Sequence, residues 1–146
     1  MIQEHVTTMQ GVRVHLLPTD KYKTTTLVFK FKAPLTKETV TMRALLPYVW
    51  QSGTATYPSM KALRTYLDDL YGATLNVDLM KKGEYHVMTI RLDVANEKFL
   101  SEQTSLLHQA ISLLSDIVLR PALENGRFVS QIVEQEKRAL KQRIQS

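Results

Sequence analysis

The chain of 146 residues contains no cysteine, which excludes disulfide bonds, thiolate metal sites and a cysteine nucleophile. Its five glycines are scattered, so the sequence has no glycine-rich loop of the kind that binds phosphate. No apolar run approaches the roughly 18 residues that a membrane-spanning helix needs. The opening residues MIQEHVTTMQ show neither the basic nor the apolar region of a secretory signal. We therefore expect a soluble, cytoplasmic protein without a membrane partner.

Acidic residues are fewer than basic ones, and the formal net charge is +5. Five of the lysines lie close together in the sequence, but they alternate with Thr and Phe along an expected strand and its flanks: Lys21, Lys23, Lys30, Lys32 and Lys37. Nucleic-acid binding would favour a denser basic patch with aromatic stacking residues. We expect a solvated basic face and no nucleic-acid partner.

Apolar residues make up 44% of the chain, enough for one domain with a single hydrophobic core. Alternating apolar residues and turn residues predict five strands, with a tight turn at Gly11 and a hairpin turn over residues 81–84. The predicted strands are 2–8, 12–17, 24–33, 73–80 and 85–94. The last strand alternates most regularly, with His86, Met88 and Ile90 on one side.

Helical periodicity predicts four helices, at 36–50, 60–71, 103–119 and from near Asn125 to the C-terminus. Thr36 and Ser59 are the expected N-caps of the first two, and Pro47 should bend or end the first. Strands joined by hairpins and helices grouped in pairs predict an α+β fold, with an antiparallel sheet and paired helices on one of its faces. The last helix is still patterned at Ile144, so we expect the chain to be a fragment of a longer protein.

Candidate catalytic groups are sparse. No two of the histidines are spaced i, i+4 on a helix, and they are His5, His15, His86 and His108. We interpret His86 as a hydrogen-bonded core residue and His108 as a rim residue, while His5 and His15 could face each other across the first hairpin. The neighbouring carboxylates, at 68–69 and at 134 and 136, do not form an acid–base pair. The residues alone indicate no more than an α+β domain.

Four segments, in order, resemble the pitrilysin/insulinase family of zinc metallopeptidases. VTTMQGVRVHLLP is similar to the family's first hairpin, and RALLPYVWQSGTATYPS to its active-site helix and the Gly-Thr turn that follows. LRTYLDDLYGATLNVDLMKKGEYHVMTIRL is similar to the next helix and hairpin. AISLLSDIVLRPAL with FVSQIVEQEKRAL resembles the helix pair that carries the last metal ligand. The resemblance implies a metallopeptidase-like half-domain, residues 1–146 forming one domain at the N-terminal end of a longer, two-half protein.

The family's inverted H-x-x-E-H motif supplies two zinc-binding histidines and a glutamate that activates the metal-bound water. Alignment on the Gly-Thr turn at 53–54 places the histidine positions at Ala44 and Tyr48 and the glutamate position at Pro47. The third ligand, a glutamate in the family, falls on Arg143. The resemblance therefore implies that zinc, the family's cofactor, is absent here and that no residue of this chain is catalytic.

The leading hypothesis is a non-catalytic subunit or half of a metallopeptidase assembly, which pairs with a catalytic homologue in a heterodimer or other oligomer and binds peptide. One alternative is an active hydrolase whose catalytic site lies elsewhere in a longer chain. Another is a free-standing α+β interaction module.

Overall fold

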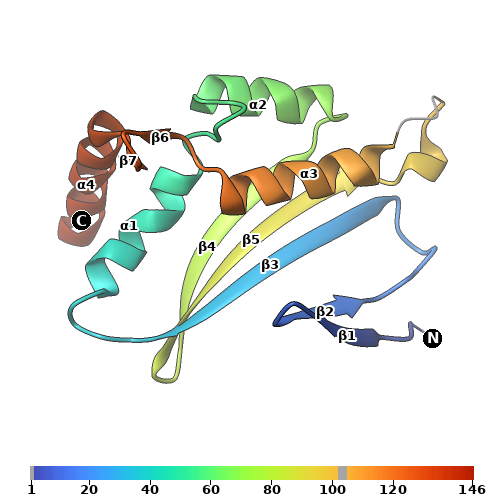
Figure 1. Ribbon diagram of the computed structural model, residues 1–146, viewed down its shortest axis with the longest axis horizontal. Coiled ribbons are helices and arrows are strands. Elements are labelled where there is room, and N and C mark those ends of the chain that lie inside the picture. Colours follow the sequence, from blue (N-terminus) through green and yellow to red (C-terminus); the bar gives the residue numbers. More distant parts are fainter. Residues whose placement is uncertain (1, 102–104) are drawn as a thin grey trace.

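The computed structural model describes residues 2–101 and 105–146. The chain begins with a hairpin of two strands, β1 (His5–Met9) and β2 (Val12–Leu16), which lies beside the larger sheet in Figure 1. Its turn residues, Gln10 and Gly11, have φ angles of 49° and 80°. Two consecutive positive φ angles suit the type I′ turn, whose twist matches that of the flanking strands. Every residue of both strands is exposed.

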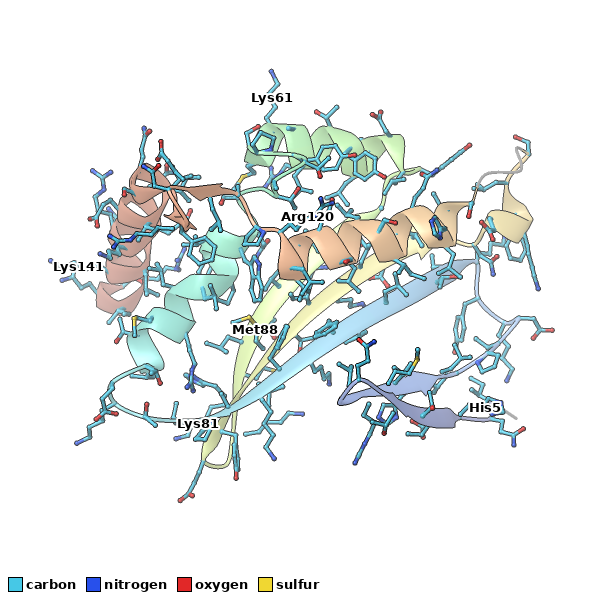
Figure 2. All side chains as sticks on the ribbon, viewed as in Figure 1. His5, Lys61, Lys81, Met88, Arg120 and Lys141 are labelled. Carbon is cyan, nitrogen blue, oxygen red and sulfur yellow. The ribbon has the colours of Figure 1, made fainter. Side chains whose placement is uncertain are left out.

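A three-stranded antiparallel sheet forms the centre of the molecule, in the order β3 (Thr24–Pro34), β5 (Tyr85–Ala95), β4 (Thr74–Lys82). The central strand β5 buries alternate residues on one side, including Met88 (Figure 2) and Ile90. The β4–β5 turn consists of Gly83 and Glu84 alone, because Lys82 pairs directly with Tyr85. The four-residue turn predicted over 81–84 is therefore too long.

Two helices cover the side of the sheet on which those residues are buried, α2 (Met60–Asp69) and α3 (Leu106–Leu119) (Figure 1). The Ser59 side chain accepts a hydrogen bond from the Ala62 N–H at 3.1 Å, which confirms the predicted N-cap of α2. One stripe of α3 is fully buried against the sheet and consists of Leu106, Ala110, Leu113 and Ile117. The predicted start of this helix, 103–104, lies outside the described residues.

The other two helices, α1 (Val40–Trp50) and α4 (Ser130–Gln145), lie side by side at one end of the sheet (Figure 1). α1 begins four residues later than predicted. The Thr36 hydroxyl is engaged with Thr39 Oγ1 at 2.6 Å and does not cap a helix, so residues 36–39 form a turn. α1 also contacts β4, and it thereby connects the sheet to α4.

A small hairpin precedes α4, formed by β6 (Leu123–Glu124) and β7 (Arg127–Phe128). Asn125 and Gly126 are its turn, with φ angles of 52° and 72°. The predicted helix start near Asn125 is therefore wrong. Asn-Gly between two short strands is the usual signal of a type I′ hairpin, and that local preference prevails over the helical periodicity that begins nearby.

The α+β fold is confirmed: α2 and α3 pack on one face of the antiparallel sheet, and α1 and α4 lie at one end of it (Figure 1). The short 3₁₀ helix η1 (Glu97–Phe99) connects β5 to the segment before α3. A single core joins α2, α3 and the sheet, and Trp50 extends it to α1. The Trp50 ring lies 5.8 Å from the Phe31 ring, centroid to centroid.

Candidate functional site

Helix α1 carries three of the four positions that the sequence singles out. Ala44 and Tyr48 are one helical turn apart and share a face of the helix. Pro47 is buried, Ala44 is half-buried, and Tyr48 is 38% exposed. α1 thus holds a methyl group, a pyrrolidine ring and a phenol where the resemblance places two histidines and a glutamate.

Pro47 does not end α1, which continues for three residues to Trp50. Proline has no N–H, so the carbonyl of Arg43 loses its helical donor. Beyond Pro47 the helix is closed by Gln51, whose backbone N–H (3.3 Å) and side-chain amide (3.1 Å) both donate to the Pro47 carbonyl. The bend that we expect at Pro47 stays a prediction.

The fourth position, Arg143, comes from α4 and meets Tyr48. The guanidinium carbon lies 4.0 Å from the centroid of the Tyr48 ring. That distance is typical of a cation–π contact, in which the guanidinium plane stacks on the aromatic face. The structure therefore brings together the second histidine position of α1 and the position of the last metal ligand, which lie far apart in the sequence.

This cluster does not offer the donor set that zinc requires. Structural and catalytic zinc sites use imidazole, thiolate or carboxylate ligands, and a catalytic site needs three of them. Tyr48 offers a phenol, Arg143 brings a permanent positive charge, and the methyl of Ala44 and the ring of Pro47 have no donor atom. Across the described ranges, 2–101 and 105–146, no three His, Asp or Glu side chains gather as a metal site would require.

The histidines do not form a second site. In the first hairpin His5 pairs with Leu16 and His15 pairs with Val6, so the two imidazoles lie on opposite faces. The expectation that they could face each other is wrong. His15 Nδ1 instead contacts the Glu4 carboxylate at 2.5 Å. His108 is exposed on α3, as predicted for a rim residue.

His86 is buried on β5, as predicted for a core residue. Its Nδ1 atom has no hydrogen-bond partner among the described residues, and the same holds for Nε1 of Trp50. The prediction of a hydrogen bond is thus not met at Nδ1.

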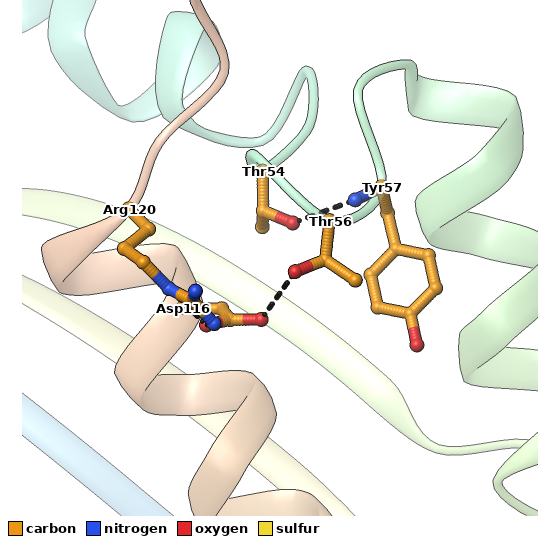
Figure 3. Close-up of polar contacts among 5 residues, drawn as sticks. All are labelled: Thr54, Thr56, Tyr57, Asp116 and Arg120. Carbon is orange, nitrogen blue, oxygen red and sulfur yellow. Dashed lines mark hydrogen bonds and ion pairs between the residues drawn. The ribbon is translucent and has the colours of Figure 1, made fainter.

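A polar loop after α1 links the end of this helix to α3, and sequence analysis missed most of its contacts (Figure 3). Thr54 is fully buried, its N–H donates to the Tyr57 carbonyl at 2.7 Å, and its hydroxyl accepts from the Tyr57 N–H at 2.9 Å. The Thr56 hydroxyl donates to Asp116 at 3.0 Å, and Asp116 also pairs with Arg120. The loop therefore fixes the C-terminal end of α1 to α3. Only the Gly-Thr pair at 53–54 gave a sequence signal for it.

The Tyr57 ring continues this loop toward α2, where it stacks on the Tyr66 ring with centroids 4.3 Å apart. Burial raises the pKa of the Tyr57 hydroxyl, and the neighbouring Tyr66 raises it further. Tyr57 therefore stays protonated at neutral pH and cannot act as a base there. Its contribution is packing between the loop and α2.

No family profile matches the chain. Over 136 residues it is 54% identical to a protein of Bacillus subtilis (strain 168) named "Probable inactive metalloprotease YmfF", covering 93% of this chain and 32% of that protein. The chain resembles an inactive metallopeptidase-like protein. It spans about a third of the length of that curated relative.

A solved structure has the same fold. The crystal structure of a conserved protein from Enterococcus faecalis V583 superimposes with a TM-score of 0.89 at 31% sequence identity. The match covers 96% of this chain and 33% of that one. Within the described ranges, no helix of this chain has the length and apolar character that crossing a bilayer demands.

Proposed function

We propose that this chain is part of a non-catalytic subunit or half of a pitrilysin/insulinase-type zinc metallopeptidase assembly. In this role it pairs with a catalytic homologue and binds peptide without cleaving it. The observation that carries the proposal is the stacking of Arg143 on Tyr48, at 4.0 Å, where the resemblance places two metal ligands. The name of the Bacillus subtilis relative, "Probable inactive metalloprotease YmfF", supports the same proposal.

The chemistry of the four positions explains why catalysis is not expected. Zinc-dependent hydrolysis needs a metal that lowers the pKa of bound water and a base that accepts its proton. A guanidinium at position 143 would repel a divalent cation, and Pro47 has no group that can accept a proton. A single substitution would therefore not restore activity, since ligands and base are missing together.

Peptide binding is supported by the edge of β4. Among the described strands, β4 pairs with β5 and with no other strand, so its second edge has no partner strand and could pair with an extended peptide. The Gln51 side chain reaches this strand and donates to the Val77 carbonyl at 3.5 Å. α1 contacts β4, so an extended peptide on this edge would run close to α1.

Pairing with another subunit is supported by apolar side chains on the outer side of α3. Leu107 is 40% exposed, Ile111 is 50% exposed and Leu119 is 73% exposed. Exposed apolar side chains that cluster on one helix commonly mark an interface. Because the chain spans about a third of its curated relative, we propose that residues 1–146 form the first domain of a longer two-half protein.

The test uses the protein at its full native length, purified without chelator and with its natural neighbours present. We expect zinc far below one equivalent, no peptidase activity, and co-purification with a homologue that keeps the H-x-x-E-H motif. Peptidase activity that persists after chelation and after substitution on α1 would favour a hydrolase with its site elsewhere in the chain. Absence of any homologous partner would favour a free-standing interaction module.

A further inference from the structure

The guanidinium of Arg143 lacks the kind of ion-pair partner that two other arginines of this chain have. Arg91 binds Asp93 at 2.8 Å and Arg120 binds Asp116. Arg143 contacts the Tyr48 ring, and no carboxylate within the described ranges forms an ion pair with it. Its charge is therefore not neutralised by the fold that positions it.

The N–H groups of this guanidinium donate no hydrogen bond to another residue within the described ranges. The guanidinium carbon lies 4.0 Å from the Tyr48 ring centroid, a separation typical of stacking. In a stacked guanidinium the N–H donors lie in the plane of the group and are not used by the ring. Arg143 is exposed, and Tyr48 is partly exposed beside it. The Tyr48 ring also restricts the orientation of the Arg143 guanidinium, so less side-chain entropy is lost when a ligand binds.

The surrounding charge favours an anion. α4 carries four basic residues and two acidic ones, and one of the acidic residues, Glu134, is already paired with Lys137. Arg43 is the single charged residue of α1. A planar anion that approaches the Tyr48–Arg143 pair therefore meets two helices that carry more basic than acidic side chains.

We propose that Arg143, held on Tyr48, binds a carboxylate of a peptide ligand. The guanidinium fork matches a carboxylate with two parallel N–H···O bonds, which a point charge such as lysine cannot reproduce. The inference rests on the proposed function, since it names the group of the bound peptide that this site recognises. A C-terminal carboxylate and an Asp or Glu side chain share the chemistry, and the experiment separates them.

Three dye-labelled pools of random nonapeptides serve as probes in fluorescence anisotropy at low salt. One has a free C-terminus and no Asp or Glu, the second has an amidated C-terminus and includes Asp and Glu, and the third lacks both kinds of carboxylate. We expect one of the first two pools to bind about tenfold or more tightly than the third, the size typical of one charge-assisted bidentate contact. The pool that binds more tightly than the third identifies the source of the carboxylate.

Arg143→Gln should lower the binding of that pool to the level of the third, and Arg143→Lys should recover only part of it. Lys141→Gln is the matched control, because Lys141 projects from the side of α4 that faces away from α1 (Figure 2). Tyr48→Phe should retain binding and Tyr48→Leu should weaken it, which tests the stacking independently of the charge. Circular dichroism of each variant verifies the fold.

Two results would overturn the inference, and they differ in what they say of the proposed function. If all pools bind equally and Arg143→Gln changes nothing, peptide binding stands but the carboxylate site does not. If no pool binds at all, both the site and the peptide-binding role are wrong.

Discussion

Gly53 occupies a backbone conformation that other residues rarely adopt, with φ at +152°. A Cβ atom there would lie 2.7 Å from the Tyr57 carbonyl oxygen and 2.9 Å from the Pro58 carbonyl carbon. Both contacts are with backbone atoms of the loop that joins α1 to α2, so neither can be relieved by turning a side chain. Glycine at this position is thus a requirement of the loop.

We expect Gly53→Ala to destabilise the protein by about 3 kcal/mol or more, through backbone strain and the clash with Tyr57. Gly126→Ala is the control, because Gly126 also has a positive φ (+72°) but open space around the added methyl. Its cost should be about 1 kcal/mol, from the backbone alone. Urea titration of both variants measures the difference, and equal losses would contradict the clash.

At the scale of single elements, α3 has one side buried against the sheet and an outer side that is exposed. Its buried stripe, which includes Ile117, packs on the sheet, while Ile111 lies on the outer side. The two isoleucines have the same chemistry and the same helical context. They differ in burial, with Ile117 0% and Ile111 50% exposed.

Ile117→Ala should therefore lower the free energy of unfolding by about 2–5 kcal/mol, the range for truncating a fully buried aliphatic side chain. Ile111→Ala should lower the free energy of unfolding of the monomer by less than about 1 kcal/mol, because folding removes little of the Ile111 side-chain area from water. Thermal and denaturant unfolding of the two variants, at low protein concentration, makes the comparison. A loss at Ile111 as large as that at Ile117 would mean that the outer side of α3 is covered.

Helix α1 gives a second prediction at this scale. Ala44→His with Tyr48→His should create no peptidase activity, because Pro47 still replaces the base and Arg143 still replaces the third ligand. Adding Pro47→Glu and Arg143→Glu supplies the base and the third ligand, so this four-site variant should retain more zinc than the two-site variant. Metal analysis after dialysis measures the zinc that each variant retains. One zinc per chain in the unaltered protein, lost on substituting α1 residues, would contradict the degenerate-site interpretation.

At the scale of the whole molecule, exposed apolar surface sets the expected behaviour of the 146-residue chain. Both strands of the first hairpin are exposed, and so are Leu107, Ile111 and Leu119 of α3. Patches of this kind are usually covered by another domain or subunit. A chain that presents them without such cover gains free energy by burying them against a second copy.

We expect this chain to self-associate in sedimentation velocity experiments as its concentration rises. Leu107→Ser with Ile111→Ser should reduce the association while leaving the thermal transition of the dilute protein nearly unchanged. His108→Gln on the same helix is the control, because His108 is exposed. A substitution of Asp116 would be unsuitable, because the Asp116 carboxylate accepts a hydrogen bond from the Thr56 hydroxyl. A monomer at the highest accessible concentration would contradict the partner-subunit proposal.

Local chemistry explains which elements sequence analysis predicted well. The period-two alternation of β5 fixed both the strand and its buried side, and Ser59 marked the start of α2 through its side-chain bond to the helix. Where two local preferences competed, the prediction failed. The Asn-Gly turn at 125–126 displaced the start of the last helix to Ser130, and the Thr36–Thr39 contact delayed α1 to Val40.

The sequence by itself determined the α+β class, the alternating faces of the sheet and the absence of histidine and glutamate from positions 44, 47, 48 and 143. These follow from residue type and short-range periodicity, which act within a few residues of the chain. Only the tertiary structure decided that Tyr48 and Arg143 meet, that β4 pairs with no described strand other than β5, and that Thr54 and Asp116 hold the loop after α1. Such contacts join segments distant in the chain, and they depend on how helices pack on the sheet, which no local pattern specifies.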